Sequence, residues 1–205
     1  MFSSSIREIE LASSKCQYVS WKLMQNNSNT FVKRVCRYLT LLQETSCQVR
    51  SFKLHMWYKF SIIRKLNYHI SLFLKSQHNL GEISFHNNQL YEEQFINLLA
   101  SCWNCSHSIE SLDLRNSFVW WDDTHKNDLT NCLSRFEKLI NLKIDFFAFN
   151  LRVEEVLLRS KHKNLRYLEI LVSNGNELHS LINQNWTTIT NHFEFLKVAL
   201  DLRKR

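Results

Sequence analysis

A six-residue pattern of apolar side chains recurs through most of this chain and limits the folds that it can adopt. Each copy has apolar residues at its first, fourth and sixth positions. The copies are VRSFKL, LGEISF, IESLDL, LINLKI, LRYLEI and FLKVAL, which start at residues 49, 80, 109, 139, 165 and 195. Successive starts differ by 31, 29, 30, 26 and 30 residues, so a unit of about thirty residues is repeated, as repeat architectures require.

The segments between these copies have apolar residues at helical spacing. This spacing occurs within residues 62–74, 95–102, 129–136, 153–157 and 178–189. A strand followed by a helix and by a second strand in the same direction belongs to a parallel sheet. The sequence therefore predicts an α/β fold in which strands and helices alternate and successive units stack.

The repeated unit resembles the leucine-rich repeat. The family pattern LxxLxLxxNxL is matched, in order, by Leu80, Ile83, Phe85, Asn88 and Leu90. Later copies carry Ser117 or Phe147 where the asparagine would stand, and we expect less regular turns there. The resemblance implies a solenoid with a parallel concave sheet and convex helices, built from about six repeats over residues 49–205. Residues 1–48 are predicted to be an N-terminal lead and a capping helix that covers the first repeat. The helix is expected from about residue 29 to residue 43, with Phe31, Val35, Leu39 and Leu42 on its apolar face.

The irregular repeat lengths and the closing segment WTTITNHFEFLKVAL are similar to the substrate-recognition half of F-box proteins. This likeness implies a protein-interaction module that recognises substrates for an SCF-type (cullin-RING) ubiquitin ligase and has no catalysis of its own. An F-box usually opens with Leu-Pro, and none is found because the chain has no proline. A ligase adaptor is therefore an expected partner only if the full-length protein carries an F-box. The alternatives are a free-standing scaffold unrelated to ubiquitin and, less favoured, a nucleic-acid-binding protein.

The third, fifth and seventh positions of each copy point away from the core, because side chains alternate across a strand. They supply the predicted partner-binding residues Lys53, His55, Ser84, His86, Asp113, Arg115, Lys143, Asp145, Tyr167 and Glu169. The segment SFVWWDD adds Trp120 and Trp121, which are either core residues or exposed anchors of the kind that dominates interfaces. Acids and bases nearly balance on this surface, and their signs alternate along the sheet in a way that permits lateral ion pairs.

The net charge of +7 has its excess bases elsewhere, on residues 33–37, 159–163 and 203–205. A phosphate backbone selects a groove of one sign, which the balanced strand surface does not offer. These bases are interpreted as solvated surface, and nucleic acid is not the expected partner.

Catalysis, cofactors and metals are not expected. The chain has two glycines and no proline, so it has no glycine-rich phosphate loop. Cys102 and Cys105 have the spacing of a metal or redox pair, but no second pair completes four ligands.

The N-terminal residues carry charges at Arg7, Glu8 and Glu10, where a secretory signal needs an apolar run. No later segment has the length and apolar character of a membrane span. Six cysteines in a chain of this size are expected to be reduced thiols. We therefore expect a cytoplasmic or nuclear protein that does not contact membranes.

Overall fold

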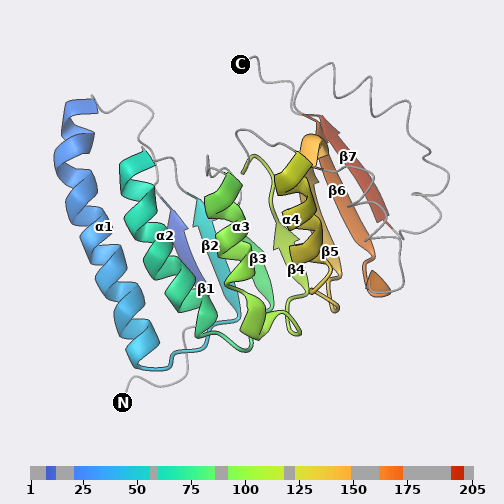
Figure 1. Cartoon of the computed structure of the whole chain (residues 1–205), viewed down its shortest axis with the longest axis horizontal. Helices are drawn as coiled ribbons and strands as arrows, with labels where there is room; N and C mark the ends of the chain where they lie inside the picture. The colour runs from blue at the N-terminus through green and yellow to red at the C-terminus, as the bar shows by residue number, and fades with distance from the viewer. Residues whose placement is uncertain are drawn as a thin grey trace.

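The structure is a computed structural model that describes residues 8–12, 21–55, 60–85, 92–117, 123–148, 162–172 and 195–200. Its strands are β1 (Glu8–Ala12), β2 (Ser51–His55), β3 (Glu82–Ser84), β4 (Ser111–Asp113), β5 (Asn141–Asp145), β6 (Tyr167–Val172) and β7 (Phe195–Leu200). Its helices are α1 (Trp21–Glu44), α2 (Phe60–Lys75), α3 (Glu92–Ala100) and α4 (Asp123–Leu133), with short 3₁₀ turns η1 (Trp103–Cys105) and η2 (Phe146–Ala148). Strands and helices alternate from β1 to β5 (Figure 1).

All seven described strands form one sheet, in which the spatial order is the chain order and every pair is parallel. The fourth positions of the first five copies are in register and form one row across the sheet: Phe52, Ile83, Leu112, Leu142 and Leu168. Leu196 continues this row, although it is the second residue of the copy predicted to start at residue 195, so the register of the last copy differs by two residues from the prediction. The period of about thirty residues thus corresponds to one strand per unit, and the predicted parallel α/β fold is confirmed.

Backbone hydrogen bonds at the amino-terminal ends of the strands join the units in a regular way. The Arg50 carbonyl accepts from the N–H groups of Gly81 (2.9 Å) and Glu82 (3.0 Å). The carbonyl of the equivalent residue in each of the next three units accepts in the same way from the following unit. These acceptors are Gly81, Glu110 and Ile140, and the last of them accepts from Arg166 and Tyr167. The units that begin with β3, β4, β5 and β6 therefore share the same two-bond junction.

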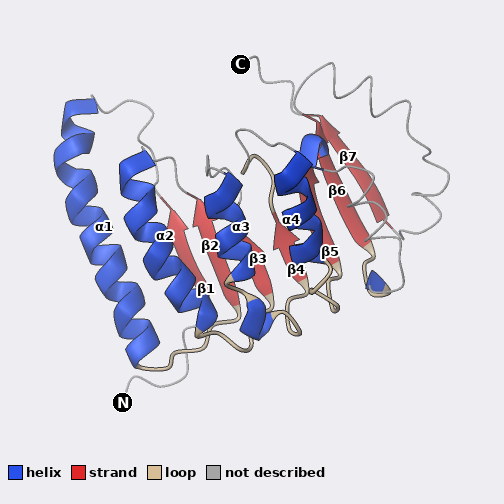
Figure 2. Ribbon diagram, in the orientation of Figure 1, coloured by secondary structure: helices blue, strands red, loops and turns tan. Residues whose placement is uncertain are grey.

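The helices α1 to α4 lie side by side on one face of the sheet (Figures 1 and 2). Apolar residues of the strands and helices form one contiguous core that extends from Ile9 to Val172. Aromatic rings link its layers, because Phe52 lies 5.7 Å from Phe73 and Phe85 lies 5.7 Å from Phe95. The first, fourth and sixth positions of the five copies from Val49 to Ile170 are buried here, which explains their apolar character.

The N-terminal region differs in detail from the prediction. The lead contains β1, which pairs with β2 and contributes the buried Ile9 to the core. The first helix begins at Trp21, earlier than the predicted start near residue 29, and ends at Glu44. The predicted apolar face is buried at Val35, Leu39 and Leu42.

The predicted helices within residues 153–157 and 178–189 lie outside the described residues, as do Asn88 and the tryptophans of the SFVWWDD segment. Within the described part of the chain, no helix combines the length and the apolar character needed to span a bilayer.

Candidate functional site

The polar face of the sheet carries the third- and fifth-position side chains of the strands, which alternate with the core residues. Strand register places the fifth positions of the first five copies in one row, which runs Lys53, Ser84, Asp113, Lys143 and Glu169. Lys197, predicted as a third position of the last copy, continues this row. Adjacent strands are about 4.8 Å apart, so neighbouring side chains in this row are within reach of each other. We call this surface the polar face.

Arg115 links two acidic residues of the polar face, Asp113 and Glu169. Its guanidinium donates to both carboxylate oxygens of Asp113, with Nε–Oδ1 at 2.9 Å and Nη2–Oδ2 at 2.7 Å. Its remaining Nη1 donates to Glu169 Oε1 at 2.9 Å, across the intervening strand β5. The hydrogen bonds with Asp113 raise the pKa of Arg115, and burial of the guanidinium opposes this shift without cancelling it. Such forked contacts fix the geometry of both partners.

Glu169 is the centre of this network. It is 2% exposed, yet it accepts from Arg115, from the Tyr167 hydroxyl at 3.0 Å and from Lys197 Nζ at 3.3 Å. Lys143 Nζ lies 4.0 Å from the same carboxylate. Burial raises the pKa of Glu169, but the charge of Arg115 and the hydrogen bonds from Tyr167 and Lys197 outweigh it, so the pKa lies below its ordinary value. Glu169 is therefore an ionised, buried carboxylate.

The hydroxyl of Tyr167 is affected by the same network. Burial raises the pKa of Tyr167, and the hydrogen bond to Glu169 adds to this increase. Tyr167 thus remains a neutral donor that orients the carboxylate of its neighbour.

A second, smaller pair lies on β2 and β3. Glu82 Oε2 accepts from the Ser51 hydroxyl at 2.9 Å, and Glu82 Oε1 lies 3.9 Å from Lys53 Nζ. The Glu82 side chain is 43% exposed, so this is a weak surface pair.

Asp145 and Ser117 stabilise the turn that follows β4. Asp145 is buried, and its Oδ1 accepts from the backbone N–H of Asn116 at 2.9 Å. Asn116 has a φ of 54°, a left-handed conformation that asparagine tolerates better than most residues. Ser117 is buried and donates its hydroxyl to the Phe85 carbonyl of the preceding unit. Ser117 is the ninth residue from the start of its copy, where a less regular turn was expected, and it joins this turn to the backbone of the preceding unit.

A groove of about 440 Å³ borders the polar face at the amino-terminal ends of β2 to β5. It is lined by second- and third-position residues, namely Arg50, Ser51, Gly81, Glu82, Glu110, Ser111, Ile140 and Asn141. A Cβ at Gly81 would be accommodated in this groove, because it would lie 3.7 Å from the nearest atoms, in ordinary van der Waals contact.

The structure brings together five of the predicted partner-binding residues: Asp113, Arg115, Lys143, Tyr167 and Glu169. Lys53 belongs to the separate pair, while Ser84 and Asp145 lie on the polar face but are buried. The backbone of His55 ends β2, but its side chain is outside the described residues, as are His86, Trp120 and Trp121.

Lys197 and Glu82 were not among the predicted binding residues and are part of these contacts. The strand register identifies both residues, because it places Glu82 opposite Ser51 and Lys197 opposite Glu169. Among the described residues, no group of three or more histidine, cysteine, aspartate or glutamate side chains could hold a metal ion.

No family model matches the chain, and no curated protein matches it.

Proposed function

We propose that the chain is a leucine-rich-repeat solenoid whose polar face is concave and binds another protein. The observation that carries this proposal is the single parallel sheet, in which units of about thirty residues place successive strands side by side with helices on one face. Repeat proteins with this arrangement use the exposed strand surface as an extended binding site.

The charge network supports a role in specificity. Glu169 is buried among cations, so the positions of Arg115, Tyr167 and Lys197 are fixed before a partner arrives. The side chains of Lys143 and Lys197 are 35% and 59% exposed, so both can contact a partner carboxylate. Exposed charges of fixed position discriminate between partners more than they add affinity.

We further propose, from the likeness to F-box proteins, that the bound partner is a substrate of an SCF-type ubiquitin ligase. A full-length protein with an F-box would dock the ligase adaptor through that module, and the repeats would select the substrate. The alternative is a repeat scaffold with no link to ubiquitin.

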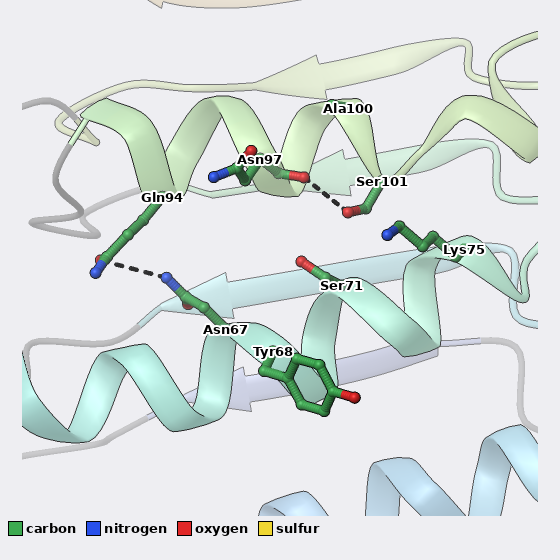
Figure 3. A pocket seen from close by; sticks show the side chains of 8 residues that line it. All are labelled: Asn67, Tyr68, Ser71, Lys75, Gln94, Asn97, Ala100 and Ser101. Carbon is green, nitrogen blue, oxygen red and sulfur yellow. Dashed lines mark hydrogen bonds between the residues drawn. The ribbon is translucent and has the colours of Figure 1, made fainter.

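A photo-crosslinking residue at Asn141 tests the binding surface, with the same residue at Tyr68 on α2 as a control. Asn141 lies on the polar face, whereas Tyr68 is exposed on α2 and lines a pocket between α2 and α3 (Figure 3). We expect a discrete crosslinked protein from position 141 alone. The double variant Lys143→Glu/Lys197→Glu should lower its yield at least fivefold, whereas Lys33→Glu/Arg34→Glu on α1 should not. Equal yields from both positions, or no effect of the polar-face variant, would reject this surface.

The ligase role is tested by capture of the endogenous protein. Recovery of the cullin adaptor, together with slower turnover of the crosslinked partner when the protein is depleted, is the expected result. A crosslinked partner whose turnover is unchanged, without the adaptor, would support the scaffold instead.

A further inference from the structure

The loops that lead from each helix to the next strand lie along one edge of the sheet. This follows from the topology, because parallel strands in chain order all begin at the same edge. These loops are seen together at the lower edge of the view in Figure 2. We call this strip the loop edge, and it consists of residues 44–50, 75–81, 100–110, 133–140 and 162–166.

Side-chain contacts hold the first three loops together. Gln48 donates to the Ser76 carbonyl at 2.8 Å, and Gln77 donates to the Cys47 carbonyl at 3.0 Å. Asn104 donates to the Lys75 carbonyl at 2.6 Å, and Ser108 donates to the Leu80 carbonyl at 2.9 Å. The loops therefore present their exposed side chains from fixed positions.

The later loops continue the same strip. The Arg135 guanidinium lies 4.5 Å from the centre of the Trp103 ring. The Ile140 N–H donates to the Glu110 carbonyl at 2.8 Å, and the Arg166 N–H donates to the Ile140 carbonyl at 2.9 Å. Successive loops are thus spaced as the strands are, at about 4.8 Å.

Positive charge predominates on the loop edge. It carries six bases, which are Arg50, Lys75, Arg135, Lys138, Lys163 and Arg166, and all six are exposed. It carries three acids, which are Glu44, Glu110 and Glu137. His78 and His107 are exposed on the same strip. Within the described part of the chain, Lys75, Lys138 and Lys163 form no ion pair, so their charges remain available to an anionic ligand.

Trp103 also lies on the loop edge, and it is 60% exposed. Exposed tryptophan is costly in water, and Arg135 contacts its ring as a cation. An exposed aromatic ring on a strip where basic side chains outnumber acidic ones suits single-stranded nucleic acid, in which nucleobases stack on the ring and cations contact phosphates. A duplex keeps its bases stacked on each other, so it does not suit this ring.

We propose that the loop edge is a second binding surface, which takes single-stranded nucleic acid. Lys75, Lys138 and Lys163 contact phosphates, and Trp103 stacks on an unpaired base. The exposed amides of Asn104 and Asn164 lie on the same strip and can contact base edges. This surface is distinct from the polar face, so the proposal stands whether or not the polar face binds a protein.

Fluorescence anisotropy with labelled 15-nucleotide oligouridine and oligothymidine tests the proposal at several salt concentrations. The variant Lys75→Ala/Lys138→Ala/Lys163→Ala should weaken binding and reduce the slope of log affinity against log salt by about 2, since each contact to a single strand contributes about 0.7. Lys33→Ala/Arg34→Ala/Arg37→Ala removes the same charge from exposed positions on α1 and should leave the slope unchanged. Equal losses from both variants would overturn the proposal, as would the absence of binding.

The stacking role has its own matched pair of variants. Trp103→Ala should weaken oligonucleotide binding about tenfold, whereas Tyr38→Ala, at a 42% exposed aromatic residue on α1, should not change it. Trp103→Phe should restore most of the affinity, and thermal melting checks that each variant is folded. Competition with poly-glutamate distinguishes nucleic acid from acidic protein as the ligand of the loop edge. If it displaces the oligonucleotide with equal potency and Trp103→Ala has no effect, the loop edge binds acidic protein and the proposal is wrong.

Discussion

Glu169 is stabilised as an ion although the protein removes it from water. A carboxylate in this position is tolerated only when cations and hydrogen-bond donors replace its hydration. Arg115, Tyr167 and Lys197 provide these contacts from three different strands or strand ends. The network therefore joins β4, β6 and β7 through a single side chain.

Removal of the main cation should be costly. Arg115→Ala leaves Glu169 with less compensation for its burial, and we expect the free energy of unfolding to fall by about 2 to 4 kcal/mol. Lys143→Ala removes the more distant partner, at 4.0 Å, and should cost at most about 1 kcal/mol. Urea unfolding of both variants measures the difference. Equal effects would show that Arg115 has no special role.

The lowered pKa of Glu169 predicts an acid-sensitive contribution to stability. Ionised Glu169 stabilises the folded protein above the ordinary glutamate pKa of about 4.3. This contribution is lost as the pH falls below that value and through the lower pKa of the folded state. The free energy of unfolding of the wild type should therefore exceed that of Glu169→Gln by a constant amount from pH 7 to about 5.5, and the excess should shrink below about pH 4.3. Urea unfolding across this range tests it, and a constant excess down to pH 3 would contradict it.

The sequence predicted the row in which Glu169 lies but not its strongest contact. Alternation along strands and the thirty-residue period are enough to place Asp113, Lys143 and Glu169 in neighbouring strands. The contact between Arg115 and Glu169 joins residues 54 positions apart and crosses β5. It depends on where the chain turns after β4 and on the reach of one guanidinium, and neither has a signature in the apolar pattern.

Among the elements, α1 shows most directly how an apolar stripe determines packing. The stripe includes Val35 and Leu39, which are buried, while Leu41 is 48% exposed on the same helix. Since α1 packs against α2 and has no favourable charges in its first or last turn, the helix is stabilised by packing of this apolar face.

Leu39 and Leu41 offer a matched comparison. Leu39→Ala creates a cavity in the core and should lower the free energy of unfolding by about 2 to 4 kcal/mol. Leu41→Ala changes an exposed side chain of the same type and should have an effect within about 0.5 kcal/mol. Thermal or urea unfolding distinguishes them, and similar values would mean that α1 is not packed as described.

The strand β1 was not predicted, although its apolar spacing is present. IREIEL has apolar residues at Ile6, Ile9 and Leu11, and the latter two are in register with Phe52 and Leu54. This copy starts 43 residues before the next, because the 24-residue helix α1 lies between them. A search for a constant period passes over a unit whose helix is longer than the others.

For the whole molecule, each unit packs mainly against its neighbours, and the interior is continuous from Ile9 to Val172. In such an arrangement, strands at the centre of the sheet are paired on both sides, whereas β1 and β7 each pair with one described strand. Stability should therefore decrease from the centre toward the two edges.

Amide hydrogen exchange measures this gradient. The N–H groups of Ile83, Leu112 and Leu142 should exchange slowest, and those of β1 at least tenfold faster. Uniform protection from β1 to β6 would show that the sheet opens only as one unit.

The grouping of bases on the loop edge is a property of the whole molecule that the sequence pattern did not predict. Lys75, Lys138 and Lys163 are separated by 63 and 25 residues, and they lie in segments without periodicity. Only the parallel order of the strands brings them to one edge. The acidic and basic residues of any one β-strand, considered alone, do not indicate this arrangement.

The two-bond junction between units has a consequence for how such a gene can change. The carbonyls of Arg50, Gly81, Glu110 and Ile140 each accept two hydrogen bonds from backbone N–H groups of the following unit. Because only backbone atoms take part, the junction does not depend on the side chains of the residues that form it. In-frame duplication or loss of one internal unit would form an equivalent junction between the two units that become neighbours. The length of the protein can thus vary in steps of about 4.8 Å along the sheet, while the remaining units keep their original neighbours.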